Sequence, residues 1–176
     1  SLHPRAPACV ESGDLSNRDR QWVKQDQDQA WTLARYILKD AQEAEDAVQE
    51  ACVKLWNNQD SIDPERVKPW LMKVTRNGCL DRLRRRRHNV EFDESHMAGE
   101  ARGPMQGLAT SELSGWLRRS IESLKEPYRS LVVLRDVHQH SYEDVAGMLE
   151  LSLSQVKVYL HRARKELREQ LAEVRP

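Results

Sequence analysis

The chain has 176 residues, of which 39% are hydrophobic and 32% are charged, and its 28 basic residues balance its 28 acidic ones. This length suits one ordinary domain or two small ones. The chain contains only seven glycines and seven prolines, and this low number favours helices over turn-rich β structure. The composition predicts an all-α protein. The three scattered cysteines, Cys9, Cys52 and Cys79, exclude a disulfide framework and a paired-cysteine zinc site.

The opening residues of the sequence do not predict a targeting signal. No apolar run approaches the roughly 18 residues of a membrane span, and residues 1–21 lack the apolar core of a signal peptide. We therefore expect a cytoplasmic protein with reduced thiols. Residues 1–19 combine prolines and a glycine with polar side chains and show no periodicity, which predicts a disordered leader.

Two helices are predicted next, at about residues 20–39 and from about residue 41 to 57. Asp40, followed three residues later by Glu43, can cap the second helix. The predicted buried positions of the first helix are Val23, Ala30, Ala34, Ile37 and Leu38. Those of the second helix are Ala44, Val48, Cys52, Leu55 and Trp56. The other side of the second helix is mainly acidic, with Glu43, Asp46, Gln49, Glu50 and Lys54.

A polar connection at residues 57–68 leads to a third helix that is predicted to end near Arg87. Pro69 suits its first turn. Its predicted buried residues are Trp70, Leu71, Val74 and Leu83. Its second half is strongly basic, with Arg76, Arg82, Arg84, Arg85, Arg86 and Arg87 against the single acid Asp81. The neutral total charge therefore hides separate acidic and basic segments.

Residues 90–110 mix glycines, a proline and acids without a sustained period, which predicts a flexible linker. The linker divides the chain into a domain at residues 20–89 and a second domain at residues 111–176. In the second domain the periodicity predicts helices at about 111–124, 126–137, 142–149 and 155–171. Short connections between them imply a compact bundle.

The last two helices have a helix-turn-helix layout. Ser141 and Asp144 form a capping-box pattern before the first of them. In the final helix one face is apolar, with Val156, Leu160, Ala163 and Leu167. A recognition helix needs one face that packs on its own domain. Its opposite face can then reach base edges, while Lys and Arg neutralise phosphates. A solvated basic face on an ordinary C-terminal helix would give the same pattern.

Three segments, taken in order, resemble one family. They read AEDAVQEACVKLW, then KPWLMKVTRNGCLDRLRRRR, then EPYRSLVVLRDVHQHSYEDVAGMLELSLSQVKVYLHRARKEL. This order is similar to regions two and four of bacterial RNA polymerase sigma factors of the extracytoplasmic-function type, from about Ala34 to Leu171. The resemblance implies a non-enzymatic subunit without cofactor or metal that directs the core polymerase to specific promoters. It also implies control by an anti-sigma factor, commonly a membrane-associated protein.

The same resemblance implies three groups of functional residues. The acidic helix would dock on the polymerase core through Glu45, Asp46, Gln49 and Glu50. The loop 57–68 and the third helix would recognise and melt the minus-ten element, using Asn77, Asp81, Arg84, Arg85, Arg86 and Arg87. The final helix would enter the minus-thirty-five element with Ser154, Gln155, Lys157, Val158, His161 and Arg162, while Arg164 and Lys165 contact phosphate. Without the resemblance, the acidic face reads as an ordinary solvated surface.

Some positions depart from the family pattern. Glu150 stands where the family often has a turn glycine, and Ser154 with Gln155 replaces a common Gly-Thr pair. Gln can make a bidentate contact to adenine whereas Thr cannot, so base preference is expected to differ. Ile62 occupies a loop position that is often aromatic, and Trp70 fits a core position better than a base-stacking one.

Two other classes of function are compatible with parts of the chain. An enzyme would have to use His138 and His140, with Cys79 or His161 as a partner, but no metalloprotease motif, phosphate loop or nucleophile elbow occurs. A free-standing helix-turn-helix regulator would explain the final helices. It would leave the acidic helix and the arginine-rich helix without a role.

Overall fold

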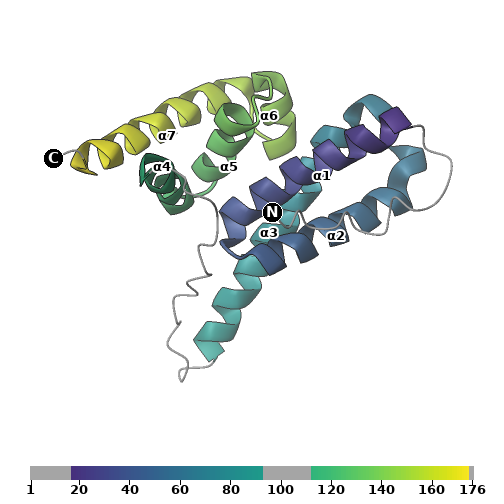
Figure 1. Cartoon of the computed structure of the whole chain (residues 1–176), viewed down its shortest axis with the longest axis horizontal. Helices are drawn as coiled ribbons and strands as arrows, with labels where there is room; N and C mark the ends of the chain where they lie inside the picture. Colours follow the sequence, from purple (N-terminus) through teal and green to yellow (C-terminus); the bar gives the residue numbers. More distant parts are fainter. Residues whose placement is uncertain (1–16, 93–111, 175–176) are drawn as a thin grey trace. The chain divides into compact units, whose positions relative to one another are not determined.

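The computed structural model describes residues 17–92 and 112–174, and within these ranges the chain forms helices and no β-strand (Figure 1). The all-α prediction is confirmed. The chain divides into two compact units, residues 1–88 and 89–176. The predicted leader, apart from residues 17–19, and the predicted linker from residue 93 onward lie outside the described residues.

From residue 17 onward, unit 1 is built from three α-helices and two short 3-10 helices. The elements are α1 (Asn17–Leu38), α2 (Ala41–Asn58), η2 (Gln59–Ser61), η3 (Pro64–Arg66) and α3 (Val67–Phe92). Helices α1 and α2 pack side by side. Between them Lys39 has a left-handed backbone (φ 60°), and the carboxylate of Asp40 accepts a hydrogen bond of 2.8 Å from the backbone N–H of Glu43. The predicted cap of α2 is confirmed.

Helices α1 and α3 are longer than predicted. Helix α1 begins at Asn17, inside the expected leader, and α3 continues to Phe92, inside the expected linker. Arginine is a good helix former, and nothing in the arginine run or in the residues after it breaks a helix. The helical hydrogen bonds therefore propagate beyond the residues that pack on the core.

The buried stripe of α2 differs from the predicted one at its end. Ala44, Val48 and Cys52 are buried as expected, but Leu55 is only partly buried and Trp56 is 50% exposed. The stripe is completed instead by Ala47 and Ala51, which the sequence analysis passed over. Small side chains at this spacing let α1 approach closely, whereas Trp56 lies in the last turn, next to an exposed connection.

Helix α3 also buries different residues from most of those predicted. Leu71 is buried, but Trp70, Val74 and Leu83 are each only partly covered. The remaining fully buried positions of α3 are Met72, Thr75 and Cys79. Thr75 carries a hydroxyl and ranks low in hydropathy, whereas Met72 and Cys79 are apolar residues that the predicted stripe left out.

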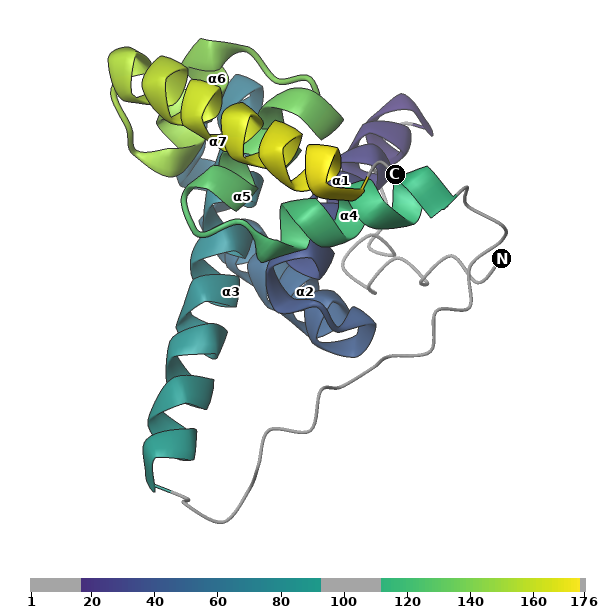
Figure 2. The same ribbon diagram turned by 90° about the vertical axis from the view of Figure 1, so that its left-hand side faces the viewer.

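Unit 2 contains α4 (Glu112–Ser123), α5 (Tyr128–Val132), the π-helical turn η4 (Val133–Val137), α6 (Tyr142–Leu149) and α7 (Leu153–Val174). Helix α7 packs against α4, α5 and α6 (Figure 2). The four predicted apolar residues of α7 are confirmed as buried: Val156, Leu160, Ala163 and Leu167. The helix predicted at 126–137 is a short α-helix that widens into η4, where the N–H of His138 bonds to the carbonyl of Val133.

Two turns define the helix-turn-helix. Ser141 caps α6 by accepting a hydrogen bond of 3.1 Å from the N–H of Asp144, as predicted. Helix α6 ends at Leu149 and is capped by Glu150, whose backbone is left-handed (φ 56°), and the N–H of Leu151 bonds to the carbonyl of Ala146 at 3.0 Å. This is the conformation for which glycine is usually selected.

The left-handed Glu150 gives a prediction for stability. We expect Glu150→Gly to be more stable than Glu150→Ala by about 1 kcal/mol, because glycine avoids the clash between Cβ and the backbone in this conformation. Urea unfolding followed by circular dichroism measures the difference. The alanine variant is the matched control, since both variants lose the same side chain, and equal stability of the two would contradict the prediction.

Candidate functional site

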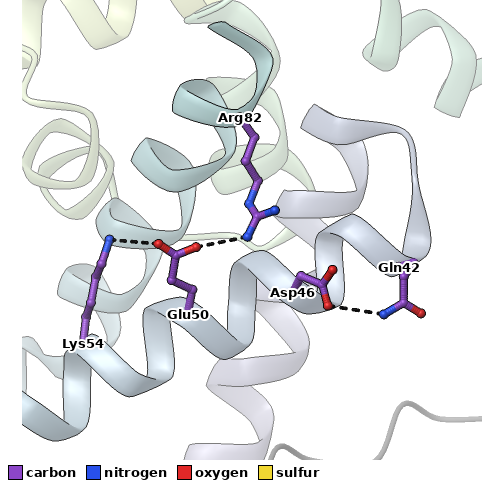
Figure 3. Close-up of polar contacts among 5 residues, drawn as sticks. All are labelled: Gln42, Asp46, Glu50, Lys54 and Arg82. Carbon is purple, nitrogen blue, oxygen red and sulfur yellow. Dashed lines mark hydrogen bonds and ion pairs between the residues drawn. The ribbon is translucent and has the colours of Figure 1, made fainter. Parts of the chain in front are cut away.

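The four residues that the sequence analysis assigned to polymerase docking lie on one side of α2. Asp46, Gln49 and Glu50 are exposed and Glu45 is partly exposed. Amide groups one turn away order two of the carboxylates: Gln42 donates to Asp46 at 3.3 Å (Figure 3) and Gln49 donates to Glu45 at 3.4 Å. The side chain of Gln49 is thus oriented along the helix, and the acidic surface is arranged by i,i+4 contacts.

Glu50 belongs to a different environment from Asp46. One of its oxygens lies 3.0 Å from Nη2 of Arg82 on α3, and the other lies 3.5 Å from Nζ of Lys54 (Figure 3). Desolvation alone would raise the pKa of the Glu50 carboxyl, but the hydrogen bond from Arg82 and the positive charges of Lys54 and Arg82 outweigh it and hold the pKa below its usual value. Glu50 therefore stays ionised.

A second ion pair, between Arg86 and Glu43, also joins α3 to α2. Part of the basic run is thus balanced by the acidic helix. From the sequence, Arg82 had no predicted contact and Arg86 was expected to contact DNA. The opposite charges of the two segments were visible in the sequence, but the register that pairs them depends on how α3 crosses α2.

Three other arginines near the end of α3 are turned to solvent. Arg84, Arg85 and Arg87 are exposed, and so is Asn77. Arg84 makes a local ion pair of 3.0 Å with Asp81, one turn earlier. The last turns of α3 extend past α2 (Figures 1 and 2). The structure therefore presents a basic helical surface that is accessible to a polyanion.

The start of α7 contains a capping box that the sequence analysis missed. The N–H of Gln155 donates to the hydroxyl of Ser152 at 3.1 Å, and the N–H of Ser152 donates to Oε1 of Gln155 at 2.9 Å. Helix α7 consequently begins at Leu153, two residues earlier than predicted. The motif S-x-x-Q, in which both partners satisfy backbone donors, was present in the sequence as Ser152–Gln155.

The residues assigned to the minus-thirty-five element share one exposed surface of α7, with one exception. The exposed residues are Ser154, Gln155, Lys157, Val158, His161, Arg162 and Lys165. Arg164 is turned away from this surface far enough to form an ion pair with Asp136 of η4. Val158 is a 46% exposed apolar side chain within an otherwise polar and basic surface.

The histidines considered for an enzyme lie in the turn before α6. The rings of His138 and His140 contact each other edge to face, with centroids 6.0 Å apart. Across residues 17–92 and 112–174, no group of three or more His, Cys, Asp or Glu side chains could hold a metal ion. In the same ranges, no helix is long and apolar enough to cross a bilayer.

Two helical units, the second of which presents a basic helix after a tight turn, define the class of two-domain helix-turn-helix proteins. Comparison with protein families is more specific. Residues 22–89 match Sigma-70 region 2, and residues 114–167 match Sigma-70, region 4. The matches fall on unit 1 and unit 2 respectively.

Individual relatives agree with the family matches. The chain is 32% identical over 154 residues to the ECF RNA polymerase sigma factor SigE of Mycolicibacterium smegmatis, a match that covers 85% of this chain and 60% of that protein. It is 28% identical over 159 residues to the ECF RNA polymerase sigma factor SigW of Bacillus subtilis, covering 84% of this chain and 85% of that one.

Solved structures share the fold. The sigma factor RpoE in complex with the anti-sigma factor NepR from Bartonella quintana matches with a TM-score of 0.74 and 25% identity, over 91% of this chain and 100% of that one. CnrH in complex with the cytosolic domain of CnrY matches with a TM-score of 0.65 and 22% identity, over 91% of this chain and 92% of that one. The chain belongs to the sigma-70 family and, within it, to the extracytoplasmic-function sigma factors.

The capping box leads to a prediction about Gln155. Gln155→Ala removes the acceptor of the Ser152 N–H and is expected to destabilise unit 2 by about 1 kcal/mol, whereas Gln155→Glu retains an acceptor and is expected to be close to wild type. Urea unfolding of the purified chain measures both. Ser154→Ala, at the adjacent exposed position, is the control for a substitution outside the cap. A Gln155→Ala variant as stable as Ser154→Ala would contradict the capping role.

Proposed function

We propose that this protein is an alternative sigma factor that directs core RNA polymerase to a specific set of promoters in the cytoplasm. The observation that carries the proposal is the pairing, on one chain, of a region-two unit with a region-four unit whose α7 exposes a basic surface. Each unit by itself would suit several kinds of protein. Their combination in this order is what a promoter-recognition subunit requires.

Docking on the polymerase is assigned to the acidic surface of α2. Asp46 supports this role best, because it is exposed and its carboxylate accepts a hydrogen bond from the neutral amide of Gln42, which leaves its negative charge uncompensated by that contact. Glu50 shares its charge with Arg82 and Lys54, so a partner would have to compete for it. Electrostatic attraction to a basic partner surface would therefore act mainly through Glu45 and Asp46.

Contact with the minus-ten element is assigned to α3 and to the connection at residues 57–68. Most of this connection is exposed, as separated single-stranded bases would require. Arg84, Arg85 and Arg87 are the arginines of α3 best placed to follow a phosphate backbone. Arg86 is assigned a smaller part, because its guanidinium already pairs with Glu43.

Reading of the minus-thirty-five element is assigned to the first turns of α7. A bidentate contact to adenine needs both the oxygen and the nitrogen of a glutamine amide, and Oε1 of Gln155 is already used by the helix cap. Base preference would then come mainly from Lys157, His161 and Arg162, with Ser154 and Val158 at the edges of the contact. Lys165, farther along the helix, would contact phosphate.

Regulation is assigned to an anti-sigma factor. The solved structures of RpoE and CnrH each contain a partner in complex, and the first of these partners is described as an anti-sigma factor. In this chain the exposed acidic surface of α2 and the exposed side of α7 lie on separate units. A single protein that covered both surfaces would block polymerase docking and DNA binding together, and a membrane-associated partner would link release to an external signal.

Run-off transcription tests the proposed function. Purified core polymerase, the chain and a pool of promoters from the genome that encodes it are expected to give initiation at a discrete set of promoters. Asp46→Lys is expected to reduce this initiation by at least about tenfold, because it reverses charge at the docking surface. The variant should also bind core polymerase more weakly in a pull-down.

Asp28→Lys, which reverses an exposed acid on α1, is the matched control and should retain full initiation. Equal loss in both variants would indicate a general effect of charge and would contradict docking through α2. Tight binding of the chain to a palindromic DNA site without core polymerase would favour a free-standing regulator instead.

A further inference from the structure

Two consecutive residues of η4 connect this short turn to both helices of the helix-turn-helix. Arg135 donates a hydrogen bond of 2.8 Å to the carbonyl of His140, and its guanidinium lies over the ring of Tyr142 at 4.5 Å. Asp136 accepts two hydrogen bonds from Arg164 of α7. Arg135 thus holds the start of α6, while Asp136 holds the middle of α7.

The contact between Asp136 and Arg164 has the geometry of a strong ion pair. Nη2 of Arg164 lies 2.5 Å from Oδ1 of Asp136, and Nε lies 3.1 Å from Oδ2. Exposed ion pairs usually contribute little, but two parallel hydrogen bonds between a guanidinium and a carboxylate are the exception. The side chains are 41% and 34% exposed, so the pair is partly shielded from water.

The surroundings favour the charged form of Arg164. Its pKa is raised above the usual value, first by the hydrogen bond to Asp136 and, with smaller effect, by the charge of Asp136 and a hydrogen bond with Tyr142. Tyr142 is therefore linked to both arginines: the guanidinium of Arg135 lies over its ring, and Tyr142 contributes to the raised pKa of Arg164. Four side chains from η4, α6 and α7 form one connected polar cluster.

We propose that the Asp136–Arg164 ion pair is a positioning device that sets α7 on the rest of unit 2, and that Arg164 is not a phosphate contact. The inference rests on the proposed role of α7 in reading the minus-thirty-five element. The acid and the base cancel each other, so the pair would release few counterions from DNA. A phosphate that approached Arg164 would also be repelled by Asp136.

The neighbouring cations of α7 provide the contrast. Lys165 is 67% exposed, and its nearest acid, Glu169, is at the limit of an ion pair at 4.0 Å. Arg162 is also exposed. Either residue can reach a phosphate without breaking a bidentate contact, which makes Lys165→Ala the matched control for loss of a positive charge.

A charge swap distinguishes a positioning pair from a phosphate contact. Promoter affinity of the holoenzyme and urea unfolding of the chain would be measured for Asp136→Arg, Arg164→Asp and the double variant. If the pair positions α7, each single variant should bind the promoter about fivefold more weakly and unfold at lower urea, and the double variant should recover most of both.

The salt dependence of binding adds a readout that instability alone would not change. For Arg164→Ala, the slope of log affinity against log salt should equal that of the wild type, whereas Lys165→Ala should lower it by about one without changing the unfolding midpoint. A double charge-swap variant as weak as Arg164→Asp, together with a reduced slope for Arg164→Ala, would overturn the proposal.

Failure of the proposed function would be seen separately. A wild-type holoenzyme that binds no promoter would exclude the sigma-factor role of the chain, whatever the variants do. The unfolding measurements would still decide the ion pair, because they need neither polymerase nor DNA. A double variant that is less stable than both single variants would overturn the positioning role of the Asp136–Arg164 ion pair.

Discussion

Burial of one apolar face of α7 is the constraint on which the DNA-facing surface depends. Val156, Leu160 and Ala163 are almost fully buried against the other helices of unit 2. A helix can bury only one face in this way, so the side chains between these positions must face solvent. The packing therefore decides which residues of α7 DNA can reach, before any contact with a base is considered.

The ends of the helices supply the second constraint. Left-handed residues at Lys39, Gln139 and Glu150 each lie shortly before a helix. Polar caps follow at Asp40, Ser141 and Ser152. The chain thus turns sharply without glycine at these points and then satisfies the first N–H groups of the next helix. In the helix-turn-helix this arrangement fixes where α7 starts.

Charge has a structural as well as a functional use in this protein. The net charge at pH 7 is zero because acidic and basic residues are equal in number, and some of these opposite charges meet between elements, in pairs such as Glu50–Arg82, Glu43–Arg86 and Asp136–Arg164. Charges that remain exposed, such as Asp46 on α2 and Arg85 on α3, are left for partners. Paired and exposed charges look alike in a sequence. A binding surface predicted from a charged run is therefore too large, because some of its residues pair with charges inside the protein.

The sequence by itself determined the helical class, the family, the caps of α2 and α6, and the buried face of α7. The helical class, the caps and the buried face depend on residues close together in the chain, where periodicity and capping chemistry act directly, and the family follows from the order of three such local segments. The tertiary structure alone decided that Trp56 is exposed, that Thr75 and Cys79 are buried, and that Arg82, Arg86 and Arg164 pair with acids. These outcomes depend on how one helix crosses another, because a shift of one residue in that register changes which side chains meet.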